Sequence, residues 1–101
     1  MPRYKLLKAS EADLEDIWKY TYESWGGRQA SKYLRQLKKR IEALSRNPDI
    51  GWQRDNLSKG LMCFREGRHL IFYRKLKMGI VIIRVLHDRM DVPERIKETE
   101  E

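Results

Sequence analysis

His87 has the surroundings that an acid–base residue needs, because it ends an apolar segment and has arginines on both sides. Residues 84–91 read RVLHDRMD. An imidazole beside guanidinium groups suits acid–base catalysis of RNA cleavage, with Arg84 or Arg89 stabilising the charge of the transition state. The same segment also fits a structural role, in which His87 caps a sheet and the aspartates hold arginines in place. No glutamate is placed to accept the proton of a nucleophile, so we assign no catalytic residue and keep His87 with Arg84 as the alternative.

A basic segment is the second candidate site. Residues 28–46 carry seven cationic side chains and one acidic one, whereas residues 11–25 are mainly acidic. Lysines and arginines clustered on one helix can bind phosphates or an acidic protein segment. The alternative is that the two segments pair their opposite charges with each other. The cations of the basic segment are Arg28, Lys32, Arg35, Lys38, Lys39, Arg40 and Arg46.

Composition excludes several classes of protein. The chain has 101 residues and a formal net charge of +7, so we expect one domain over 1–101 and an anionic partner. Cys63 is the single cysteine, which excludes an internal disulfide, and two histidines with one cysteine are too few for a zinc site built from these ligands. The sequence contains neither a phosphate-binding loop nor an apolar run of membrane-spanning length. We therefore expect a cytoplasmic protein with no metal, no cofactor and no membrane contact.

The N-terminal part of the chain predicts a short strand and a helix. Residues 3–8 alternate weakly between apolar and polar side chains, as a short strand does. Ser10 is placed to cap a helix over 11–25, and Asp13, three residues further on, can reach back to it as in a capping box. Apolar side chains recur in this helix with helical spacing. Gly26 and the glycine after it end this helix.

A second helix is predicted over 28–46. It ends before Pro48, because the residue that precedes a proline avoids the helical region. The connection between the two helices is short, so we expect an antiparallel hairpin. Trp25, at the turn, is expected to cover the core of this hairpin.

The C-terminal half predicts an antiparallel meander. Strands over 61–65, 69–74 and 80–87 are separated by turns that contain glycine, and 48–60 is a loop. Residues 88–101 are expected to form a polar tail or a short helix. The fold class is therefore α+β, with an N-terminal strand, a two-helix hairpin, a three-stranded meander and a short C-terminal segment.

The predicted meander carries apolar side chains on both faces. The helical hairpin can cover only one of these faces, and an apolar face left in water loses about 25 cal/mol for each Å² that could be buried. The other face therefore needs a cover. The loop around Trp52, the C-terminal segment and a second polypeptide are the three possibilities, and the sequence leaves all three open.

The order of these elements, together with a set of short matches, resembles the ParE toxins of the RelE/ParE superfamily, which are the toxin halves of bacterial type II toxin–antitoxin pairs. The resemblance covers roughly residues 9–96, and the ordered set carries it rather than any single motif. The matches are Ala12-Asp13-Leu14, Ile17, Tyr20, Glu23-Ser24-Trp25-Gly26, Gln29-Ala30, Tyr33-Leu34, Leu37, Asn47-Pro48, Gly51, Gly60-Leu61, His69, Ile71-Phe72-Tyr73, Ile80, Arg84-Val85-Leu86-His87 and Arg89-Met90-Asp91.

The resemblance implies both a partner and a target. The partner is a cognate ParD-like antitoxin, whose acidic amphipathic C-terminal segment folds onto the toxin, and operator DNA is contacted only through that antitoxin. The ParE branch implies inhibition of DNA gyrase without catalysis. The RelE branch implies cleavage of messenger RNA on the ribosome, usually with a tyrosine or histidine near the C-terminus. Residues 88–101 contain neither, so His87 is the residue that would serve this alternative.

We expect the antitoxin to contact the uncovered face of the sheet and the basic helix. Gyrase is expected to contact residues 88–97, on grounds of exposure. A toxin-like chain that binds an antitoxin without being toxic is a further possibility. The predicted antitoxin-binding residues are Arg35, Lys39, Ile71, Tyr73 and Arg84.

Overall fold

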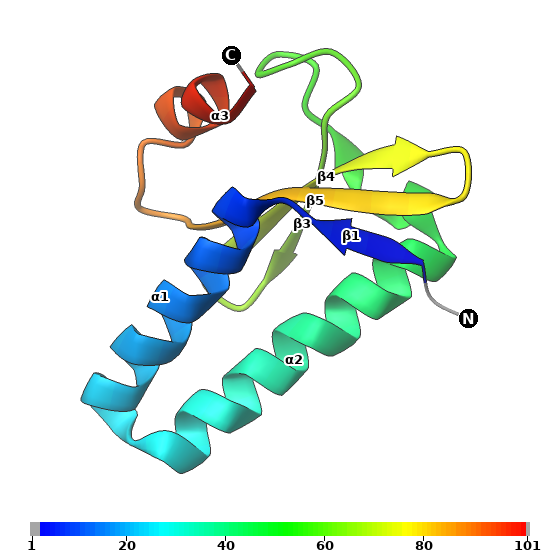
Figure 1. The fold of residues 1–101 in the computed structure, drawn as a ribbon. Helices are drawn as coiled ribbons and strands as arrows, with labels where there is room; N and C mark the ends of the chain where they lie inside the picture. Colours follow the sequence, from blue (N-terminus) through cyan, green and yellow to red (C-terminus); the bar gives the residue numbers. More distant parts are fainter. Residues whose placement is uncertain (1–2, 101) are drawn as a thin grey trace.

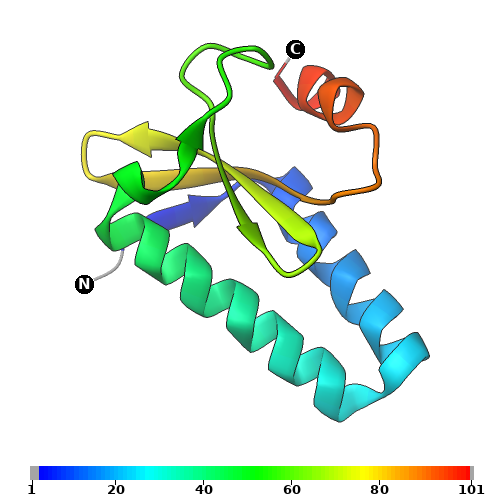
Figure 2. The same ribbon diagram turned by 180° about the vertical axis from the view of Figure 1, so that it is seen from behind.

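A computed structural model describes residues 3–100 of the chain. A five-stranded sheet carries two long helices on one face and a short helix on the other (Figures 1 and 2). In chain order the helices and strands are β1 Tyr4–Leu6, α1 Lys8–Trp25, α2 Gly27–Arg46, a 3-10 turn Pro48–Ile50, β2 Trp52–Gln53, β3 Met62–Glu66, β4 His69–Leu76, β5 Gly79–His87 and α3 Val92–Glu100.

The predicted meander is confirmed, and the sheet extends beyond it on both sides. The strand order is β1-β5-β4-β3-β2. The three meander strands pair antiparallel, β1 pairs parallel with β5, and the two-residue β2 pairs antiparallel with β3. The sequence prediction missed β2, because a strand of two residues is too short to show an alternating pattern.

The helical hairpin is confirmed, with one correction at its start. Helix α1 begins at Lys8, so Ser10 lies inside the helix, where its hydroxyl donates to the Leu7 carbonyl oxygen at 2.7 Å. Gly26 has φ +90° and ends α1, as predicted, and its carbonyl oxygen already accepts from the Ala30 N–H of α2. The two helices run antiparallel and separate with distance from this turn (Figure 1).

Trp25 does not cover the hairpin core, and this prediction is wrong. Its side chain is 74% exposed, and Tyr22 and Trp18, one and two turns before it, are also exposed. Helix α1 instead buries a narrower stripe that includes Asp13, Ile17 and Thr21. The helical spacing of the aromatic side chains predicted that they belong to the buried face of α1. In the structure these side chains are exposed, and a different side of the helix faces the sheet.

The main core lies between the sheet and the hairpin. Leu37, Ile41 and Leu44 of α2 pack against Ile71 and Tyr73 of β4, and all five side chains are buried. The Tyr73 hydroxyl donates to the Pro48 carbonyl oxygen at 2.7 Å and accepts from the Gly51 N–H at 3.2 Å. These bonds let a polar side chain end inside the core without an unpaired hydroxyl.

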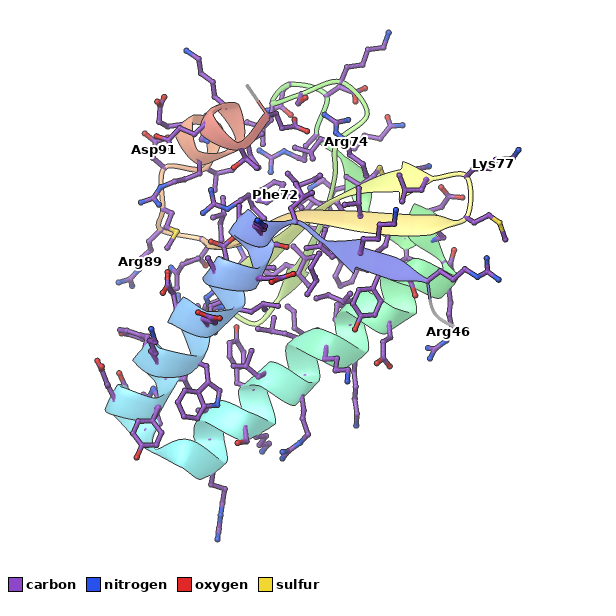
Figure 3. The ribbon with its side chains drawn as sticks, in the orientation of Figure 1. Arg46, Phe72, Arg74, Lys77, Arg89 and Asp91 are labelled. Atoms are coloured by element: carbon purple, nitrogen blue, oxygen red, sulfur yellow. The ribbon has the colours of Figure 1, made fainter. Side chains whose placement is uncertain are left out.

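A second apolar cluster covers the other face of the sheet. Val92 and Ile96 of α3 pack there against Phe72 and Leu86, together with Leu61 from the loop before β3. Figure 3 shows Phe72 on this side of the sheet and Arg74 directed toward α3 and the loop. The Arg74 guanidinium donates twice to the Glu100 carboxylate, at 2.8 Å each, and once to the Lys59 carbonyl oxygen at 2.7 Å. Of the three covers that the sequence left open, the chain therefore supplies the terminal segment and a loop.

Candidate functional site

A cavity of about 470 Å³ lies where α1, the end of β5 and the segment that leads into α3 meet. Two histidines, His69 and His87, contribute to its lining, and Tyr20 and Met90 supply apolar surface. Arg89 and Arg95 also line it, and Figure 3 shows Arg89 extending outward from the molecule. It holds the predicted acid–base residue His87 and is therefore the candidate functional site.

Arg84 lines the same cavity but is paired with Asp13. Its Nε and one terminal nitrogen each donate to a different oxygen of that carboxylate, both at 2.7 Å. The two side chains are 12% and 9% exposed. The Val85 N–H donates to the same carboxylate at 2.9 Å. The carboxylate raises the pKa of Arg84 above its ordinary value, mainly through these hydrogen bonds.

This ion pair changes the role that the sequence suggested for both residues. Asp13 does not reach back to cap its own helix, but joins α1 to β5. Arg84, which was expected to stabilise a transition state or to bind the antitoxin, is held by Asp13 and, through its other terminal nitrogen, by the Thr99 hydroxyl at 3.0 Å. These contacts hold the Arg84 guanidinium in place and offset its charge, so we propose a structural role for Arg84.

His69 is the second imidazole of the cavity, and sequence reasoning gave it no role. Its Nδ1 shares a hydrogen bond of 2.6 Å with the Tyr33 hydroxyl of α2. Its ring stands edge-on to that of His87, with centroids 5.3 Å apart. Burial, with a smaller effect of His87, lowers the pKa of His69 to about 4, so this imidazole is neutral at pH 7. The missed signal was the turn between β4 and β5, because the register that follows from it places His69 opposite His87.

His87 itself is oriented by the chain that follows it. The Arg89 N–H donates to its Nδ1 at 3.1 Å, which places the proton of the neutral ring on Nε2. The Asp88 carboxylate lies 3.2 Å from the same nitrogen and accepts a hydrogen bond from Arg65 at 2.9 Å. That bond lowers the pKa of Asp88. The cavity thus contains two imidazoles, of which His69 is neutral at pH 7, whereas the Arg84 cation beside them is paired with Asp13.

Two of the predicted antitoxin contacts are buried. Ile71 and Tyr73 have no exposed surface and lie under α2, so neither can contact another chain in this structure. The prediction failed because alternate residues of β4 face opposite sides, and it is the side of Phe72 that faces α3. That side is covered too, so the sheet offers no open apolar face within residues 3–100.

The other two predicted contacts are exposed on the basic helix. Arg35 and Lys39 lie on the side of α2 that faces away from the sheet, and neither forms an ion pair within residues 3–100. Arg40 is different, because it donates to the Glu66 carboxylate at 2.9 Å and lies 4.6 Å from the centre of the Phe64 ring. No ion pair joins α1 to α2 in the described part of the chain, so the pairing of the two helices by charge is not observed.

Comparison with solved structures identifies the fold first. The chain has the fold of a chain from the chromosomal ParDE toxin–antitoxin system of P. aeruginosa, with a TM-score of 0.73, 19% identity and coverage of 86% of this chain and 96% of the other. No helix within residues 3–100 is long and apolar enough to cross a membrane.

Sequence comparison then identifies the family. The family model for the ParE toxin of the type II toxin–antitoxin system, parDE, matches residues 4–92. Toxin ParE1 of Mycobacterium tuberculosis is 42% identical over 95 residues, which covers 93% of this chain and 97% of that protein. Toxin ParE1 of Caulobacter vibrioides is 40% identical over 91 residues, with 90% and 94% covered. The chain belongs to the ParE toxin family.

Proposed function

We propose that this toxin acts in the cytoplasm by inhibiting DNA gyrase through surface recognition, and that a ParD-like antitoxin neutralises it. The observation that supports recognition over catalysis is the Arg84–Asp13 pair, whose side chains are 12% and 9% exposed. The Asp13 carboxylate takes two of the five N–H donors of this guanidinium and the Thr99 hydroxyl takes a third, and the carboxylate offsets the positive charge that would stabilise a phosphorane. Of the two cations that the sequence offered to His87, Arg84 is therefore committed to Asp13, and Arg89 remains in the lining of the cavity.

The antitoxin is proposed to bind the basic helix. Arg35 and Lys39 are exposed there, and an acidic segment placed along α2 would reduce the net charge of +7. Exposed charge pairs raise the rate and selectivity of association more than its affinity. For gyrase we propose residues 88–97, where Arg89 and Arg95 are exposed beside the cavity.

A supercoiling assay tests the gyrase proposal. Purified toxin should reduce supercoiling by gyrase and should increase the amount of cleaved DNA trapped by the enzyme. Addition of the antitoxin should reverse both effects. A substitution of Arg89 and Arg95 by Ala should weaken inhibition, whereas Lys77→Ala, at the exposed turn between β4 and β5, serves as the control. Normal supercoiling at toxin concentrations that stop growth would reject the proposal.

One observation favours a second function, the ribosome-dependent cleavage of RNA. The His69 and His87 rings share the cavity with centroids 5.3 Å apart, and Arg89 and Arg95 line it as well. If the imidazoles catalyse proton transfer, His87→Gln should abolish growth arrest and transcripts should be cut in translating extracts. Under the gyrase proposal the same variant keeps its toxicity and transcripts stay intact.

A further inference from the structure

The outer face of the helical hairpin, which points away from the sheet, carries two rows of opposite charge. On α1, Glu11 and Glu15 are four residues apart and exposed. On α2, Arg28, Lys32 and Arg35 follow one another with spacings of four and three residues and are exposed as well. Such spacings place side chains on one side of a helix. We call them the acidic row and the basic row.

Neither row faces the sheet or forms an ion pair within residues 3–100. The side chains that face the sheet lie on the opposite sides of the two helices, such as Ile17 in α1 and Leu37 in α2. No side chain of either row forms an ion pair in the part of the chain that the structure describes. Lys8, three residues before Glu11, and Lys19, four residues after Glu15, lie on the same side of α1, but the exposed acids of this helix outnumber them. These acids are Glu11, Glu15, Asp16 and Glu23.

Exposed aromatic side chains accompany the two rows near the tip of the hairpin. Trp18 is 39% exposed and Tyr22 is 51% exposed, and their rings stack with centroids 5.0 Å apart. The Tyr22 ring reaches the start of α2, since a Cβ added to Gly27 would lie 3.4 Å from it. Trp25 follows at the turn with 74% of its side chain exposed. Contiguous apolar surface of this kind marks an interaction surface in a protein of this size.

We propose that this face binds a second copy of the chain around a two-fold axis. In such a dimer the acidic row of each copy lies against the basic row of the other, so the same pairing is made twice. Trp18, Tyr22 and Trp25 are then sheltered near the hairpin tips. An acidic antitoxin segment would use the basic row alone and leave Glu11 and Glu15 unpaired, whereas a second copy satisfies both rows. Arg35 belongs both to the basic row and to the proposed antitoxin contact, so a second copy and the antitoxin would compete for this part of α2. The inference does not depend on gyrase inhibition.

The oligomeric state of the full chain tests the proposal. Sedimentation equilibrium should show a monomer–dimer equilibrium that shifts toward monomer as salt is raised, because exposed charge pairs are screened. Arg28→Glu with Lys32→Glu, the basic-row variant, should raise the dimer dissociation constant at least tenfold. Glu11→Lys with Glu15→Lys, the acidic-row variant, should do the same. Lys77→Glu, at the turn between β4 and β5, changes the charge away from this face and should leave the constant unchanged.

Mixing the two variants is the decisive step. Each variant alone sets like charges against like, but in the mixed dimer the reversed rows meet charges of opposite sign at both contacts. The mixture should therefore dimerise at least as tightly as the original chain, while circular dichroism shows both variants folded. A chain that remains monomeric at about 1 mM, where association is worth no more than about 4 kcal/mol, would overturn the proposal. A dimer dissociation constant that the charge reversals leave unchanged, or a mixture of the two variants that stays monomeric, would overturn it too.

Discussion

Asp13 and Arg84 form a doubly hydrogen-bonded ion pair between α1 and β5, although 71 residues separate them in the chain. The Asp13 carboxylate also accepts from the Val85 N–H, so three donors converge on one buried group. The pair fixes the position of the first helix on the sheet. It also removes the charge of Arg84 from the cavity that contains His69 and His87.

Removal of Asp13 should therefore destabilise the fold strongly. Asp13→Ala leaves the Arg84 charge buried without a partner and the Val85 N–H without an acceptor, and breaking a buried pair in this way costs about 3–5 kcal/mol. Asp16→Ala, one turn further along α1 at an exposed position, should change the free energy of unfolding by less than about 0.5 kcal/mol. Urea denaturation of both variants measures the difference. Equal stabilities would show that the pair contributes nothing to the fold.

Local patterns predicted the helical hairpin and the meander, because the spacing of apolar side chains and the glycines at the turns act over a few residues. Contacts between distant segments were not predictable in this way. Asp13 has a spacing from Ser10 that suits a helix cap, but its partner comes from β5. Likewise, the parallel pairing of β1 with β5 and the covering of Phe72 by α3 depend on which segments meet in space.

The same limit applies to the candidate site. His87 could be named from its neighbours in the sequence. His69 and Tyr33 could not, since their hydrogen bond joins β4 to α2. For Trp25 the sequence led to a wrong prediction rather than to an omission. The sequence places an aromatic side chain at the hairpin turn, but it does not determine which side of the helix faces the core.

Ile96 tests whether α3 is an integral cover of the sheet. Its side chain is 1% exposed and packs in the cluster that contains Phe72 and Leu86. Ile96→Ala should lower the free energy of unfolding by about 2–5 kcal/mol, the usual cost of removing a large aliphatic side chain from a core. Lys97→Ala, the exposed neighbour, should cost less than about 0.5 kcal/mol. If Ile96→Ala proves equally mild, α3 does not seal this face in solution.

Gly79 is required where the β4–β5 turn meets the N-terminal strand. It has φ +102°, and a Cβ at this position would lie 2.1 Å from the Arg3 carbonyl oxygen, which accepts from the Ile80 N–H. Gly79→Ala should cost more than about 2 kcal/mol, from backbone strain and the displaced strand together. Gly26 is a matched control, since it has φ +90° but open space around the added Cβ. Gly26→Ala should cost only the backbone strain of φ +90° with ψ 173°, about 1–3 kcal/mol, and less than Gly79→Ala. Thermal denaturation of the two variants measures both losses of stability. The difference between them is the cost of the collision, apart from the backbone strain that both variants share.

His69 should make the stability of the chain depend on pH. Its pKa falls from 6.5 to about 4 on folding, so the unfolded chain binds a proton between these values that the folded chain does not. This contribution is fully present above about pH 6.5 and is lost as the pH falls toward 4. The side chain is partly exposed, so we expect a loss on the order of 1 kcal/mol. His69→Gln should flatten that part of the stability profile, and NMR titration of the ring gives the pKa directly. A pKa near 6.5 in the folded chain would contradict the expectation.

Charge reversal on the basic helix tests where the antitoxin binds. Arg35→Glu with Lys39→Glu replaces two attractive contacts with repulsive ones, so the affinity for the antitoxin should fall at least tenfold at low salt. The fall should be smaller at high salt, where exposed charges are screened, and the salt dependence of binding should flatten. Lys75→Glu with Lys77→Glu makes the same change in net charge at the far end of β4 and should have a much weaker effect. Binding can be measured by calorimetry with the cognate ParD-like antitoxin. If both double variants lose affinity equally, only the overall charge of the toxin matters, and if neither does, the antitoxin binds elsewhere.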